Sequence, residues 1–124
     1  MTLDAATLSA LHRACRITWS RACLSISHSE FEYLDAIARE EDRQRYADDH
    51  GRHLGDIVDG LGVTRASASA MIAKLEGRGF VRRFTCRQDA RAQHIVLTDA
   101  GQDERAAGLA LYEELAGRIA DEDL

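Results

Sequence analysis

Apolar residues recur every three or four positions along most of this chain, which is the spacing of one helix face. The first such stripe predicts a helix over residues 5–24 and consists of Leu8, Leu11, Cys15, Trp19, Ala22 and Ile26. A second helix is expected from Ser27, because Ser27 and Glu30 have the spacing of a capping box. Its predicted buried face holds Phe31, Leu34, Ile37 and Ala38. The charged segment 39–52 is expected to prolong this helix and then to loop, with Gly51 ending the helix.

Two shorter helices are predicted over residues 53–62 and 63–79, joined by a tight turn. The first has apolar residues at helical spacing and ends on Gly62; these residues are Leu54, Ile57, Val58 and Leu61. The second begins after a capping Thr64 and stops at Gly77 and Gly79. Its predicted buried face consists of Ala68, Met71, Ile72 and Leu75.

Residues 80–86 and 93–98 alternate between two faces, as residues of a β-strand do. On the first strand one face holds Phe80, Arg82, Phe84 and Cys86, and the other holds Val81, Arg83, Thr85 and Arg87. On the returning strand, Ile95 and Leu97 lie opposite Val96. The polar segment 87–92 joins them into a hairpin. Thr98 is then expected to cap a last helix over residues 99–122, whose main apolar stripe is Ala107, Leu111, Leu115 and Ile119, widened by Leu109, Tyr112 and Ala116.

Two helices at a tight turn followed by a basic hairpin form the layout of a winged helix-turn-helix. We therefore predict a mostly α fold with a small β-hairpin wing. Residues 1–124 are expected to form one domain, with the winged helix-turn-helix over residues 53–98. The flanking helices, 5–24 and 99–122, carry more apolar surface than this core can cover, so we predict that they are dimerisation helices.

Three local patterns resemble the MarR family of bacterial transcription regulators. The stretch LGDIVDGLGVTRASASAMIAKLEGRGFVRR is similar to the family's helix-turn-helix and its exit into the wing. Asp89 and Arg91 fit the D-x-R element of the wing, and Leu97, Thr98 and Gly101 fit the LT-x-x-G that starts the next helix. The chain departs from the family at Ala90 and in the longer, charged segment 39–52. It also ends at Leu124, where the family's last dimerisation helix is expected to be missing.

Composition narrows the class of protein. The chain has 124 residues, 45% of them hydrophobic, and no proline, which favours a globular and mostly helical domain. No apolar run approaches the ~18 residues of a membrane span. The N-terminus has an early acid and lacks the apolar block of a secretory signal. Three cysteines without disulfide or metal spacing indicate the reducing cytoplasm.

Charge is distributed unevenly along the chain. The whole chain has a net charge of −5, yet residues 61–94 hold seven basic and two acidic residues, a net charge of +5. Positive charge is thus concentrated on the elements that would meet DNA phosphates. A solvated surface helix is the alternative reading of this segment.

The predicted DNA-binding residues follow from this layout. The N-terminal half of the helix over residues 63–79 is expected to enter the major groove, where Arg65 can pair with two acceptors of a guanine. The full predicted set is Thr64, Arg65, Ser67, Ser69, Lys74, Arg82, Arg83, Arg87 and Arg91. Because Arg82 and Arg83 point to opposite sides, only one of them is expected to face DNA. Asp89 is expected to order the wing or to hold Arg91. The serines could instead be ordinary exposed helix positions.

Small-molecule and metal sites are less well indicated. By residue type alone, an effector pocket would draw on Arg16, Trp19, His28, Tyr33 and Tyr112. His12 with Cys15, and the acids and histidines of residues 48–53, do not form a closed set of four metal ligands. Cys15 and Cys23 lie about 12 Å apart along a helix, too far for a disulfide within one chain. No cofactor site and no catalytic motif is present.

We therefore interpret the sequence as a cytoplasmic, sequence-specific DNA-binding regulator. The resemblance implies a homodimer on a pseudo-palindromic operator, a repressor role and a small-molecule effector. The alternative is a winged helix that binds proteins without DNA. An enzyme is not expected.

Overall fold

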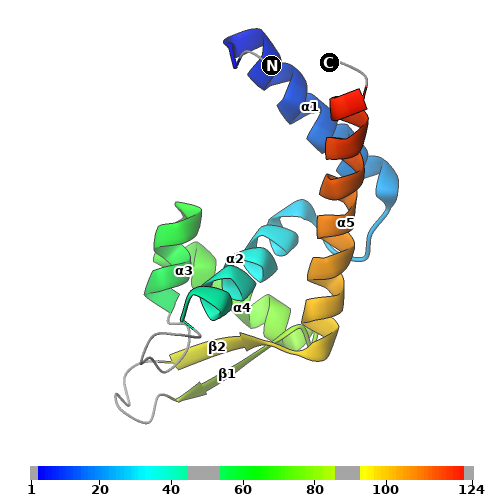
Figure 1. Ribbon diagram of the computed structural model, residues 1–124. Coiled ribbons are helices and arrows are strands. Elements are labelled where there is room, and N and C mark those ends of the chain that lie inside the picture. The colour runs from blue at the N-terminus through cyan, green and yellow to red at the C-terminus, as the bar shows by residue number, and fades with distance from the viewer. Residues whose placement is uncertain (1–2, 45–53, 86–92, 122–124) are drawn as a thin grey trace. The chain divides into compact units, whose positions relative to one another are not determined.

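The structure is a computed structural model that describes residues 3–44, 54–85 and 93–121 (Figure 1). Within these ranges the elements are α1 (Ala5–Ala22), α2 (His28–Gln44), α3 (Leu54–Leu61), α4 (Arg65–Gly77), β1 (Val81–Thr85), β2 (Gln93–Leu97) and α5 (Asp99–Asp121). The predicted mostly α fold with a small hairpin is confirmed. Backbone contacts divide the chain into two compact units, residues 26–105 and the two terminal segments 1–25 and 106–124.

The core of residues 26–105 is formed by the predicted apolar faces of the helices and the hairpin. Its largest fully buried side chains are Leu34, Ile37, Ile57, Ile72, Leu75, Val81 and Ile95. They come from α2, α3, α4, β1 and β2, so each of these elements covers part of one core. Burying a side chain of this size contributes about 1.5–3 kcal/mol to folding. The core therefore fixes α4 and the hairpin against α2 and α3.

Short-range hydrogen bonds cap the N-termini of α2 and α4 at the positions that the sequence predicts. The Ser27 amide donates to Glu30 Oε1 at 2.8 Å, and the Glu30 amide donates to Ser27 Oγ at 3.1 Å, which is the predicted capping box. The Ser67 amide donates to Thr64 Oγ1 at 3.1 Å at the start of α4. Gly62 has φ +66 between α3 and α4. This left-handed conformation suits glycine and keeps the helix-to-helix turn short.

The hairpin is antiparallel and pairs Val81 with Leu97 and Arg83 with Ile95. Paired residues share a face of the sheet, so Val81, Ile95 and Leu97 all lie on the core side, and all three are buried. Arg82, paired with Val96, lies on the other face. The predicted alternation is confirmed for residues 81–85 and 93–97, while Cys86 and Arg87 lie outside the described residues.

The start of α5 packs tightly against the chain that enters β1. Thr98 Oγ1 donates to the Gly79 carbonyl at 2.6 Å and accepts from the Gly101 amide at 3.1 Å. A Cβ added at Gly101 would stand 2.0 Å from the Phe80 carbonyl oxygen. Only glycine fits this close approach, which gives the glycine of the LT-x-x-G pattern its structural reason.

The terminal segments pair α1 with the later part of α5. Helix α1 ends at Ala22, two residues before the predicted end, because Cys23 takes a left-handed conformation with φ 51. No residue of α1 is buried, and Leu8 is 57% exposed. A groove of ≈ 510 Å³ runs between the two helices and is lined mainly by Ala14, Ile17, Ala22, Leu111, Leu115 and Ile119. None of the described helices is long and apolar enough to cross a membrane.

Candidate nucleic-acid interface

Helix α4 has one buried face and one exposed face. Ala68, Ile72 and Leu75 are buried in the core. The predicted contact residues of its N-terminal half lie on the other side and are exposed, namely Thr64, Arg65, Ser67 and Ser69, with the small Ala66 and Ala70 among them. The first turn of a helix presents unpaired backbone amides and a partial positive charge. This end of α4 therefore offers hydrogen-bond donors and positive charge to an anionic partner.

The side chains of Thr64 and Arg65, at this end of α4, each contact a neighbouring residue. The Thr64 hydroxyl donates to Ser67 Oγ at 2.9 Å, besides accepting the Ser67 amide. Arg65 extends toward the start of α3, where its Nη2 lies 3.4 Å from the position that a Cβ of Gly55 would occupy. This separation is an ordinary van der Waals contact distance, so the Arg65 guanidinium lies beside the backbone of α3 at Gly55.

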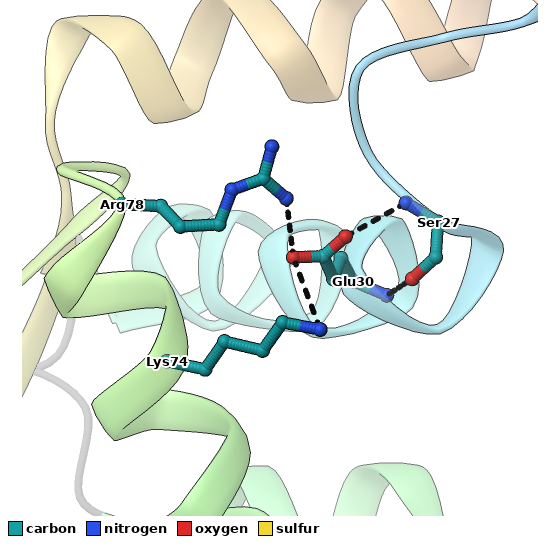
Figure 2. Close-up of polar contacts among 4 residues, drawn as sticks. All are labelled: Ser27, Glu30, Lys74 and Arg78. Carbon is teal, nitrogen blue, oxygen red and sulfur yellow. Dashed lines mark hydrogen bonds and ion pairs between the residues drawn. The ribbon is translucent and has the colours of Figure 1, made fainter.

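The C-terminal end of α4 is joined to α2 through Glu30 (Figure 2). Arg78 Nη1 donates to Glu30 Oε2 at 2.6 Å, and Lys74 Nζ lies 3.9 Å from the same oxygen. The Glu30 side chain is 4% exposed, whereas those of Arg78 and Lys74 are 35% and 58% exposed. The Arg78 guanidinium also lies 4.9 Å from the centre of the Phe80 ring. Lys74, predicted to bind DNA, is therefore ion-paired with a buried acid.

The ionised form of Glu30 is stabilised by its neighbours. Burial raises the pKa of this carboxyl, but the hydrogen bond from the Ser27 amide and the interactions with Arg78 and Lys74 lower it by more. The net result is a pKa below its usual value of 4.5. Glu30 is thus a carboxylate at neutral pH.

The two adjacent arginines of β1 differ in their partners. Arg83 lies on the core face of the hairpin, and its Nε and Nη2 donate to Glu76 Oε1 at 3.1 and 2.8 Å. The hydrogen bonds from Arg83 lower the pKa of Glu76. Arg82 lies on the other face and is exposed. The two arginines therefore point to opposite sides, as predicted, and Arg82 is the one on the exposed face.

The ion pair of Glu30 with Arg78 was not predicted from the sequence. The contacts of Asp35 were not predicted either. Its Oδ1 accepts a hydrogen bond from Arg105 Nε at 3.1 Å, and its Oδ2 forms an ion pair with Arg39 Nε at 3.2 Å. One signal was present: Ile26, Glu30 and Leu34 recur every four residues, so an acid stands on the apolar face of α2. An acid at such a position needs a basic partner when it is buried.

The remaining predicted site residues are placed as follows. Arg87, Asp89 and Arg91 of the wing lie outside the described residues. In the terminal segments, the rings of Trp19 and Tyr112 lie 6.3 Å apart between their centres, and Arg16 is exposed. In residues 26–105, His28 Nε2 lies 3.6 Å from Glu32, and Tyr33 is buried, which raises its pKa. The effector pocket stays a prediction.

Metal ligands do not gather in the described part of the chain. Residues 3–44, 54–85 and 93–121 contain no group of three or more His, Cys, Asp or Glu side chains that could hold a metal ion. Cys15 and Cys23 are not in a disulfide. His50 and His53 lie outside the described residues.

Known structures share this fold. MepR of Staphylococcus aureus, a transcription regulator of the multidrug efflux pump MepA, superposes with a TM-score of 0.80 at 18% identity, over 98% of this chain and 84% of that chain. The MepR–DNA complex has a TM-score of 0.73 at 18% identity, covering 98% and 85%. FabT of Streptococcus pneumoniae in complex with DNA has a TM-score of 0.75 at 19% identity, covering 95% and 79%.

The sequence itself assigns the family. Comparison with curated proteins gives no match. The family model of MarR matches residues 26–92, which is more than half of the chain. These residues include the capping box, the helix-turn-helix and β1 described above. The chain therefore belongs to the MarR family of transcription regulators.

Proposed function

We propose that this protein is a sequence-specific DNA-binding regulator that acts as a homodimeric repressor in the cytoplasm. The observation that carries the proposal is the exposed N-terminal half of α4, where Arg65, Ser67 and Ser69 stand opposite a buried apolar face. The DNA complexes of MepR and FabT, which share the fold, support it.

In this proposal α4 enters the major groove with its N-terminal half. Arg65 would read a guanine through two hydrogen bonds, and Ser67 and Ser69 would reach bases or phosphates. Arg82, Arg87 and Arg91 would bind phosphates or a narrow minor groove through the wing. Asp89 would order the wing.

A homodimer would form through the terminal helices. The groove between α1 and α5 and the exposed Leu8 leave apolar surface that a second copy can cover. A two-fold axis would place the two recognition helices about 34 Å apart, one turn of DNA, as a pseudo-palindromic operator requires. A small-molecule effector, for which Trp19 and Tyr112 provide aromatic surface, would favour a conformation that fits the operator less well.

Selection of bound duplexes from a random pool tests this function. Wild-type protein should enrich a pseudo-palindrome whose half-sites are centred about 10 base pairs apart. An Arg65→Ala variant should enrich it poorly, while Arg13→Ala, an exposed arginine on α1, should behave as wild type. If no sequence is enriched at low salt, the protein is not a DNA-binding regulator, and the protein-interaction alternative takes its place.

A further inference from the structure

Glu30 joins the start of α2 to the far end of the recognition helix. Its Oε1 accepts the Ser27 amide of the α2 cap, and its Oε2 accepts Arg78 and faces Lys74 (Figure 2). Lys74 belongs to the last turn of α4, and Arg78 is its C-cap residue. One buried carboxylate therefore connects the start of α2 to the C-terminal end of α4.

The position of this link matters because the proposed DNA contacts of α4 lie at the opposite, N-terminal end of the helix. A helix of 13 residues is about 20 Å long, and the proposed base contacts lie in its first turns. A tilt of about 10° at the Arg78 end would move the Arg65 end by roughly 3 Å, more than a hydrogen bond to a base tolerates. Apolar packing of Ile72 and Leu75 resists such a tilt, but it is not directional. The contacts of Arg78 with Glu30 and Phe80 are directional.

The same link also changes the charge that α4 offers to DNA. Lys74 and Arg78 would otherwise be two cations on the recognition helix able to bind any phosphate. Phosphate binding is independent of sequence, so it raises affinity for all DNA rather than for an operator. Pairing with Glu30 compensates part of this charge, and Arg78, the closer partner, is the more strongly engaged.

We infer that Glu30 is a positioning residue for DNA recognition. It fixes the C-terminal end of α4, and by pairing with Lys74 and Arg78 it weakens their sequence-independent binding to phosphates. This inference rests on the proposed function. It assigns discrimination between operator and random DNA to a residue that does not touch DNA.

The test compares Glu30→Gln with wild type on the selected operator and on a random duplex of equal length, over a range of salt concentrations. Gln preserves the size of the side chain and an oxygen for the Ser27 amide, but it removes the charge. Glu32→Gln, on the exposed side of the same helix, is the matched control. Urea unfolding of each variant corrects the affinities for the folded fraction.

We expect Glu30→Gln to weaken operator binding about three- to thirtyfold. Binding to the random duplex should stay the same or tighten, with a steeper salt dependence, because two cations are released. Glu32→Gln should leave both affinities unchanged. A purely structural role predicts an equal fall on both duplexes, and that result, or no change on either, would overturn the inference.

A second variant protects the test if Glu30→Gln does not fold. Arg78→Gln removes the principal partner from the exposed end of the ion pair, and it should also lose operator discrimination. The double variant should lose no more than the stronger single variant, because both changes break one contact. Fully additive losses would overturn the inference. Absence of wild-type binding to any DNA would instead contradict the proposed function, and this inference with it.

Discussion

Single residues in this protein are constrained by contacts that reach across the chain, and Glu30 and Gly101 are the clearest cases. Glu30 is a buried acid that is stabilised by a backbone amide and by two basic side chains. Gly101 leaves space that the Phe80 carbonyl fills. Both positions are sensitive to small changes, but for different reasons, one electrostatic and one steric.

The contribution of Glu30 to stability should depend on pH in one direction. Its folded pKa lies below the usual 4.5, so the stabilisation is present above that pH and is lost as the pH falls through the folded pKa. Glu30→Gln should therefore be less stable than wild type near neutral pH, by about 1–3 kcal/mol. The difference should shrink below pH 4.5. Chemical unfolding of both proteins between pH 3 and 7 measures it, and a constant difference would contradict the argument.

Two glycines on α5 should respond to alanine in opposite ways. Gly101→Ala places a methyl group against the Phe80 carbonyl and should destabilise the fold by about 1–3 kcal/mol. Gly117→Ala meets nothing within 4 Å and should stabilise the helix by about 0.5–1 kcal/mol. Thermal unfolding monitored by circular dichroism compares them. Equal shifts of both variants would mean that α5 does not approach Phe80 as described.

At the scale of elements, the two ends of α4 differ in exposure and in contacts. Its first turns are exposed and carry Arg65, Ser67 and Ser69, while its end is tied to α2 through Glu30 and to β1 through the Glu76–Arg83 pair. The hairpin divides its two faces in a similar way, with Arg83 turned to the core side and Arg82 exposed. The proposed DNA contacts and the contacts that hold the fold together thus lie on different parts of each element.

Arg65→Ala and Arg82→Ala should therefore change DNA binding in different ways. Loss of Arg65 removes a proposed base contact, so discrimination between operator and random DNA should shrink by about 1–3 kcal/mol. Loss of Arg82 removes a proposed phosphate contact, so affinity should fall evenly across sequences. Fluorescence anisotropy with both duplexes separates the two patterns. Unchanged affinity and discrimination in both variants would mean that the DNA face lies elsewhere.

Local elements of this fold were predictable from sequence because their causes are local. The capping box at Ser27 and the cap at Thr64 each act over three residues, so their patterns are visible in the chain itself. The Glu30–Arg78 pair joins residues 48 positions apart, and it exists only once α2 and α4 pack together. The positive charge of Lys74 was likewise visible in the sequence, whereas its ion pair with Glu30 was not. Its contact with DNA stays a prediction.

For the whole molecule, the terminal helices raise the question of assembly. Helix α1 has no buried residue within one chain, and the groove beside α5 is mostly apolar. A second copy would remove this surface from water, with a gain that grows with the apolar area covered.

Light scattering at micromolar concentration should accordingly give about twice the chain mass of 13.7 kDa. Ile119→Glu, which places a charge in the groove, should shift the protein toward monomer and weaken operator binding. Ala120→Glu, at the adjacent exposed position, should remain dimeric. A wild-type chain that stays monomeric at high concentration would rule out this assembly.

The central claim is that arginines of α4 and the wing bind DNA, and its most direct test is the salt dependence of the affinity for the selected operator. Each phosphate neutralised releases counterions, so log K should fall by about 0.9 for each unit of log salt concentration. Two or more arginine contacts per subunit predict a slope of about −4 or steeper for a dimer. A slope near zero, or no binding to any selected duplex at low salt, would contradict the account.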